Sequence, residues 1–260
     1  GDALLAALLA ACQRPRSTSL YVPGGDGPAD GYLRALEEMN ERAGRHRRRR
    51  DLAQAVGRLA RHDPDAVVPK VSALLGASTG DEELDATTRA ALVEVLAESV
   101  TAATVAGVLP TLYTSLLSTD VAVRAAAVGL WQSCSRAART LPDDLTDMAQ
   151  TLLLDPYVAV HSAMLRSFGS LGLPDATAAG LVDAFAVLAN VYDGRDPDML
   201  DRAVHGGLWA ADRSGEDDDK RRTAQIWAVS LSPKLGWHDR ERLLLDDRLA
   251  WLRPSPVWAV

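Results

Sequence analysis

The sequence is poor in aromatic residues and in cysteine. Aromatic residues make up 5% of its 260 residues, and its two cysteines are Cys12 and Cys134. Two cysteines cannot build a disulfide framework or a cysteine-ligated zinc site. This usage favours a reducing compartment, so we expect a cytoplasmic protein. The hydrophobic share of 47% is too high for a disordered chain and predicts a folded core.

Long apolar runs are also lacking. The longest run, from about Ala3 to Ala11, is about half of the roughly 20 residues that a membrane helix needs, and no basic segment precedes it. We therefore expect no transmembrane span and no signal peptide. Because the chain begins at Gly1 and not at Met, we expect a processed product, a tagged protein or a piece of something longer.

The charge is acidic but unevenly distributed. The net charge of -7 is the wrong sign for a general nucleic-acid binder. Six arginines nevertheless lie between Arg42 and Arg50, which leaves the rest of the chain strongly acidic. Arginine greatly outnumbers lysine, and isoleucine, asparagine and phenylalanine are rare. This bias is typical of a GC-rich bacterial genome and explains part of the arginine content without any function.

A helical pattern recurs along the chain. Its clearest copy runs from Leu109 to Trp131 and predicts a helix, a tight turn and a second helix. A basic residue marks each second helix, at spacings of 35, 37 and 41 residues: Arg89, Arg124, His161 and Arg202. Seven residues later, two turns along the same helical face, each copy has a large apolar residue: Leu96, Trp131, Phe168 and Trp209. We expect these four to lie in the core.

Acidic residues accompany the arginines of this pattern. In three copies an aspartate stands four residues before the arginine, and these are Asp85, Asp120 and Asp198. An acid placed four residues before a base is the favourable order on a helix. The copy with His161 departs from the pattern, because Tyr157 stands where the acid should be.

This pattern resembles HEAT repeats. In that family the first helix contains a proline, as at Pro69 and Pro110, and the second helix opens on Asp-x-x-x-Arg or Val-Arg followed by small residues. The resemblance implies an all-α, right-handed α-solenoid of about five helical pairs over residues 51–260. Residues 1–50 would form an N-terminal cap of helices, a Pro/Gly/Ser-rich loop and an arginine-rich junction. The family's ladder between successive repeats would here involve Asp85 and Arg89, Asp120 and Arg124, and Asp198 and Arg202.

Three Asp-Pro pairs predict where helices start. An aspartate accepts hydrogen bonds from the first free amides of a helix, and proline is favoured at the first helical position. The pairs are Asp63-Pro64, Asp155-Pro156 and Asp196-Pro197. No run alternates with a period of two, so no strands are expected.

The arginine run is the first candidate binding site. Arg45, Arg47, Arg48, Arg49 and Arg50 have the chemistry to bind phosphate, nucleic acid or an acidic partner. No aromatic residue is interleaved with these arginines to stack on bases, which favours a solvated helix end or a linker.

The tryptophans suggest a second candidate. HEAT-like alkylpurine DNA glycosylases use tryptophans on the concave face together with an aspartate. Here Trp131 and Trp209 fall on core positions, and the predicted solenoid is acidic where a duplex-binding surface should be basic. The remaining tryptophans, Trp227, Trp237, Trp251 and Trp258, are not assigned, and the glycosylase remains the less favoured alternative.

Catalytic and metal-binding motifs are absent from the sequence. It contains no His-Glu-x-x-His, Gly-x-Ser-x-Gly or Gly-x-x-x-x-Gly-Lys motif. The acidic run from Glu216 to Asp219 is followed directly by basic residues and predicts a helix start, not a metal site. We expect no cofactor and no metal, and a binding protein is favoured over an enzyme.

Together these patterns predict a protein-interaction scaffold or the recognition arm of a larger bacterial protein or assembly. Its second helices would present the binding surface, on which Glu94, Glu98 and Arg166 lie outside the core positions. The partner would be another protein or further domains of the same chain, with no membrane involved. The alternatives are a nucleic-acid or phosphate sensor that uses Arg42 to Arg50, and the glycosylase.

Overall fold

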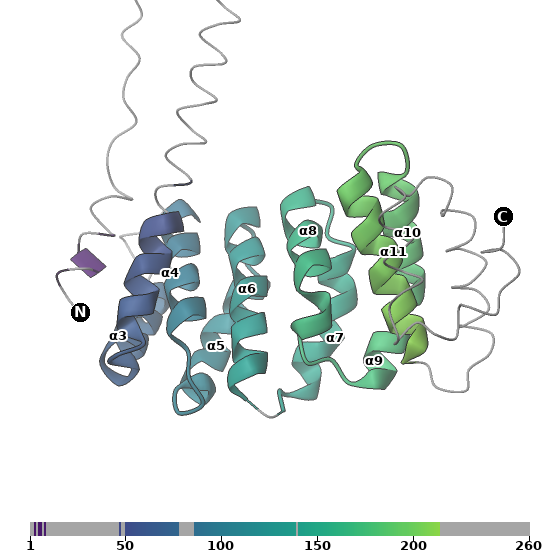
Figure 1. The fold of residues 1–260 in the computed structure, drawn as a ribbon. Helices are drawn as coiled ribbons and strands as arrows, with labels where there is room; N and C mark the ends of the chain where they lie inside the picture. The colour runs from purple at the N-terminus through teal and green to yellow at the C-terminus, as the bar shows by residue number, and fades with distance from the viewer. Residues whose placement is uncertain are drawn as a thin grey trace, which may run out of the picture. The chain divides into compact units, whose positions relative to one another are not determined.

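The computed structural model describes residues 50–77, 86–138 and 140–213, together with residues 3, 5, 6, 8 and 47. All regular structure in these ranges is helical and no strand occurs in them, which confirms the all-α prediction for this part of the chain (Figure 1). Several predictions fall outside the described residues. These concern the loop at 14–28, the helix at 30–44, the acidic run at 216–219 and the four tryptophans nearest the C-terminus.

The chain divides into two compact units, Gly1–Ser133 and Cys134–Val260. In unit 1, residues 51–60 form a helix. It is followed by α3 (Pro64–Ala77), α4 (Ala86–Ser99) and α5 (Val105–Leu116), and then by α6 (Val121–Ala137), which crosses the boundary between the units. Helix α3 packs against both α4 and α5. Aliphatic side chains form the core: Val68, Val71, Leu92, Val95, Leu96, Val108, Leu112 and Leu116.

A glycine lets the helix of residues 51–60 approach α4 closely. A Cβ atom at Gly57 would lie 2.4 Å from the Cβ of Glu98 and 2.9 Å from the main-chain oxygen of Val95. Neither atom can move away without shifting the backbone of α4. Only glycine therefore fits this contact without disturbing the packing.

Unit 2 contains two layers of helices. Its elements are α7 (Asp143–Leu153), α8 (Val158–Ser167), the short 3-10 helix η1 (Phe168–Ser170), α9 (Asp175–Ala179), α10 (Val182–Tyr192) and α11 (Pro197–Asp212). Helix α10 packs on α7 and α11, and α8 packs on the same two helices. In Figure 1 the loop from α8 to α9 lies at the bottom, so α8 runs downward and α7, which precedes it, runs upward. The loop from α10 to α11 lies at the top, so α10 also runs upward.

The Asp-Pro pairs mark helix starts in two of the three cases. Helices α3 and α11 begin at Pro64 and Pro197, and Asp196 Oδ1 accepts a hydrogen bond from the Met199 amide at 3.1 Å. The prediction for Asp155-Pro156 is wrong, because α8 begins at Val158. There the Asp155 side chain accepts the amide of Tyr157 at 2.9 Å, which closes a turn before the helix.

Aromatic side chains fill the core of unit 2. The Phe168 ring lies edge-on to Phe185 and to Trp209, with ring centres 4.5 and 4.8 Å apart. A Cβ atom at Gly206 would lie 2.3 Å from Cε1 of Phe185, so α11 needs glycine where it meets α10. The repeat-equivalent Leu96, Trp131 and Phe168 are buried as predicted, whereas Trp209 is half-buried.

Candidate interaction surface

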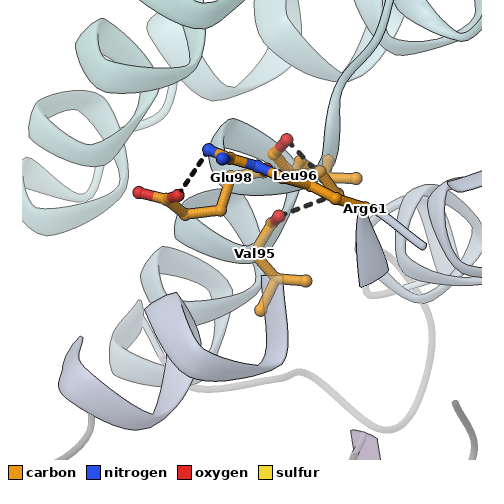
Figure 2. A network of polar contacts seen from close by, with 5 residues as sticks. Arg61, Val95, Leu96 and Glu98 are labelled. Carbon is orange, nitrogen blue, oxygen red and sulfur yellow. Dashed lines mark hydrogen bonds and ion pairs between the residues drawn. The ribbon is translucent and has the colours of Figure 1, made fainter. Parts of the chain in front are cut away.

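The two glutamates predicted to contact a ligand face arginines of the same unit. The Arg50 Nε atom lies 4.0 Å from Glu94 Oε1, and Arg61 Nη2 donates to Glu98 Oε2 at 2.8 Å. Arg61 Nε also donates to the main-chain oxygen of Glu98. In Figure 2 the Arg61 guanidinium points toward the Glu98 side chain, and a dashed line marks its contact with the carboxylate. These acids therefore join α4 to the segment that precedes α3.

Burial governs the ionisation of Glu94. Loss of hydration raises its pKa above the ordinary glutamate value. The charge of Arg50 lowers the pKa by a smaller amount, and the charge of Glu98 raises it further. A carboxylate whose environment disfavours its charge is poorly suited to attract a cationic ligand.

A second polar link in unit 1 joins successive helical hairpins. Arg89 on α4 forms a hydrogen-bonded ion pair with Asp120, the residue before α6, 31 residues further along the chain. Arg124 donates to the main-chain oxygens of Ser118 and Thr119, at 2.7 and 3.0 Å. Of the other residues predicted for the ladder, Asp85 lies outside the described residues, while Asp198 and Arg202 are exposed on α11.

His161, which departs from the repeat pattern, makes a comparable link in unit 2. Its buried ring has Nδ1 at 2.9 Å from the main-chain oxygen of Asp155, and Nε2 in a hydrogen bond with the Tyr192 hydroxyl. A carbonyl only accepts, so the neutral ring carries its proton on Nδ1 and accepts the tyrosine proton at Nε2. Burial raises the pKa of Tyr192, and the charge of Asp196 adds to the rise.

This link is not predicted by the repeat pattern, although its sequence separation is a signal. Tyr192 follows His161 by 31 residues, the separation that also joins Arg89 to Asp120. Both links end at or beside the turn between the two helices of the next hairpin. A search at that separation would have found the tyrosine.

The predicted basic residues are only partly described. Arg47 and Arg50 are helical and exposed, and Arg166 is exposed in the last turn of α8. Arg45, Arg48 and Arg49 lie outside the described residues.

Unit 2 exposes a group of large apolar side chains. Leu154, Tyr157 and Val158 lie at the turn from α7 to α8 and are 40%, 54% and 61% exposed. Val187 and Val191, one helical turn apart on α10, are 51% and 40% exposed. The ends of α7 and α10 lie at the same edge of unit 2, so Leu154 and Val191 share that edge (Figure 1).

Aspartates occupy the opposite end of the same two helices. Exposed residues recur at helical spacing along α7 and α10, and they define one surface, named here the α7/α10 face. Its acidic end carries Asp143, Asp147 and Asp183, and its apolar end carries Leu154, Val187 and Val191. Neither helix contains lysine or arginine. The face therefore changes from negatively charged to uncharged along the helices, and Gln150, Thr151 and Asn190 are exposed near the apolar side chains.

Side chains with catalytic potential are engaged in the core. Cys134 is fully buried, and burial raises the pKa of its thiol to about 12, so it is not a ready nucleophile. Trp131 is fully buried, and Trp209 lies under the Arg213 guanidinium, 3.3 Å from the ring centre. Within the described ranges, no group of three His, Cys, Asp or Glu side chains is arranged to hold a metal ion, and no helix is long and apolar enough to cross a membrane.

Comparisons with known proteins do not assign a family. No protein-family model matches the chain, and no curated protein matches it. The crystal structure of an engineered protein is similar at 16% sequence identity and a TM-score of 0.45, over 80% of this chain and 87% of that one. The described residues thus define the class as an all-α protein, and its function must be argued from its own surface.

Proposed function

We propose that the chain is a HEAT-like helical-repeat protein that serves as a protein-interaction scaffold. Three regularities support the repeat. Large core residues recur at equivalent positions, Pro69 and Pro110 are each the sixth residue of their helix, and the two polar links have the same sequence separation. Solenoids of this kind use their surfaces to bind other proteins.

The α7/α10 face is the proposed binding surface. The observation that carries the proposal is the exposure of three large apolar side chains at one end of this face, Leu154, Val187 and Val191. Scattered exposed apolar residues are ordinary on a protein surface, whereas a group of them marks an interaction site. The aspartates beside them would give the contact a polar border and a preferred orientation.

The α7/α10 face is formed by the first helix of each helical hairpin in unit 2. We propose it in place of the surface on the second helices that the sequence suggested. Glu94 and Glu98 are engaged by Arg50 and Arg61, so they contribute to the fold of unit 1. The alternatives have less support. For the nucleic-acid or phosphate sensor, Arg50 of the arginine run already faces Glu94. For the glycosylase, the rings of Trp131 and Trp209 are packed among other side chains, so neither ring is open for a base to stack on.

Recovery of bound proteins by the tagged full chain tests the proposal. The test variant is Val187→Asp/Val191→Asp, which places charges at the apolar end of the α7/α10 face. The matched control is Ala106→Asp/Ala122→Asp, because both alanines are exposed on helices of unit 1. We expect the original chain and the control to retain one stoichiometric partner, and the test variant to lose it by about tenfold or more.

Circular dichroism should show that all three proteins are folded. The proposal fails if the three proteins recover the same partner equally, or if none of them recovers a stoichiometric partner.

A further inference from the structure

We propose that the occupant of the α7/α10 face is the helix of residues 51–60 in unit 1 of a second copy of the chain. This inference rests on the proposed function, because it assumes that the face binds a protein, and it then names that protein. The two surfaces are different patches of one molecule. Contact between them is therefore heterologous and would join copies head to tail.

The proposed occupant is basic and carries an exposed leucine. It is the helix of residues 51–60 together with Arg47 and Arg50, which are also helical, and is named here the basic helix. Between Arg45 and Arg61 the sequence contains seven arginines and a single acid, Asp51. Arg47, Arg58 and Leu59 are exposed, and Leu59 is 51% accessible to solvent.

Charge complementarity selects this helix. The α7/α10 face carries Asp143, Asp147 and Asp183, and α7 and α10 contain no lysine or arginine to repel a basic partner. The basic helix buries Ala53, Val56 and Ala60 within unit 1. Arg47 and Arg58 are exposed, and Arg50 is exposed although it also faces Glu94. Opposite charges on two exposed faces steer them together and fix their orientation.

The order of charge and apolar surface also matches. On the basic helix Arg47 and Arg50 come first, and Arg58 and Leu59 come near the end. On the α7/α10 face the aspartates come first, and Val191 and Leu154 come at the end. A parallel alignment of the basic helix with α7 and α10 therefore places Arg47 and Arg50 beside the aspartates, and Leu59 with its neighbour Arg58 beside the apolar end.

Sedimentation velocity of the full chain measures the contact. In low salt, we expect the weight-average sedimentation coefficient to rise with protein concentration. It should fall when salt is added, because exposed charges are screened. Reversing the basic side with Arg47→Glu/Arg58→Glu, or the acidic side with Asp143→Lys/Asp147→Lys, should each weaken association by about tenfold or more. The control Arg195→Glu/Arg202→Glu makes the same charge change on exposed arginines of unit 2 and should associate like the original chain.

Mixing the two reversed variants is the decisive measurement. The acidic helix of one variant then meets the basic face of the other, and the original pair of surfaces also remains available between them. We expect the mixture to regain association that neither variant shows alone. The inference is overturned if the original chain stays monomeric at all concentrations, or if the mixture does not associate.

The two proposals fail separately. A chain that stays monomeric but loses a different protein partner through Val187→Asp/Val191→Asp overturns the second-copy inference and leaves the proposed function standing. A chain with no partner of any kind overturns both.

Discussion

The two units join successive hairpins at the same sequence separation with different chemistry. Unit 1 uses the ion pair of Arg89 and Asp120, and unit 2 uses the neutral hydrogen bond of His161 and Tyr192. Both links span 31 residues. The comparison teaches that the repeat specifies where a polar link is made, while the side chains that make it can change.

The outward faces of the units differ more strongly. In unit 1, α3 and α5 expose Asp65, Lys70, small residues and proline, including Ala66, Pro69, Ala106 and Pro110, and neither helix exposes a large apolar side chain. In unit 2, α7 and α10 expose aspartates at one end and valines and a leucine at the other. A common arrangement of helices therefore carries small residues and proline on α3 and α5, and large apolar side chains on α10 and at the end of α7.

Glycine substitutions should have the largest effects and test whether close helix packing is shared by the units. Gly206→Ala would place a methyl group against the buried Phe185 ring, and Gly57→Ala would place one against Glu98 and the backbone of α4. We expect each to lower the free energy of unfolding by about 1–3 kcal/mol, measured by urea denaturation. Gly129→Ala is the control, because nothing lies within 4 Å of its added methyl group. It should stabilise α6 by roughly 0.5–1 kcal/mol. Equal stability of Gly206→Ala and the original chain would contradict the packing of α10 on α11.

Removing one side of each polar link should separate the two chemistries. Asp120→Ala leaves the half-buried Arg89 charge without its acid and should cost about 1–3 kcal/mol. Tyr192→Phe removes one neutral hydrogen bond to His161 and should cost about 1 kcal/mol. Double-mutant cycles with Arg89→Ala and His161→Ala measure the coupling within each pair. A larger coupling energy for His161 and Tyr192 than for Arg89 and Asp120 would contradict the expectation that the ion pair is the stronger link.

Alkaline pH should weaken unit 2 through Tyr192. The pKa of this tyrosine is raised in the fold by burial and by Asp196, so the folded state favours the neutral hydroxyl. The unfolded chain loses the proton first as the pH rises above about 10, and stability is then lost until the folded pKa is passed. We expect the original chain to lose more stability than Tyr192→Phe between pH 9 and pH 11, on the order of 1 kcal/mol. Parallel loss in both proteins would show that the hydroxyl contributes nothing to this dependence.

The smallest effect should come from Glu94 in unit 1. Its raised pKa means that the contribution of the carboxyl to stability is full below the ordinary glutamate pKa of about 4.5 and is lost as the pH rises through the folded value. Glu94→Gln removes this loss. We expect its melting temperature to exceed that of the original chain by roughly 1–2 °C at pH 7, and the two to converge near pH 4. A lower melting temperature at pH 7 would show that the attraction to Arg50 outweighs burial.

Local patterns were sufficient to predict the helices and much of the core. The pattern from Leu109 to Trp131 predicted a helix, a turn and a helix, and α5 and α6 confirm it. Leucine and alanine periodicity is set by the helix itself and needs no knowledge of distant residues. The same holds for Asp196, whose side chain caps α11 as predicted.

Contacts between elements could not be predicted in this way. The Asp155 carboxylate closes a turn with Tyr157, and the Asp155 carbonyl accepts from His161, so the helix begins later than the Asp-Pro pair indicates. Arg61 meets Glu98 across 37 residues because Gly57 lets two helices approach, and no local pattern records that distance. The exposure of Val187 and Val191 also escaped prediction, since apolar residues one turn apart usually indicate a buried stripe.

The prolines of unit 1 have a consequence for hydration. Proline has no amide hydrogen, so Pro69 and Pro110 leave the carbonyls of Asp65 and Ala106 without their usual donor four residues further on. Both prolines are exposed, and water can hydrate these oxygens. Any protein that covered this surface would have to displace that water, at a cost of about 1–3 kcal/mol for each oxygen left unbonded. The prolines therefore disfavour dry contacts on the outer surface of unit 1, and α7 and α10, which contain no proline, carry no such penalty.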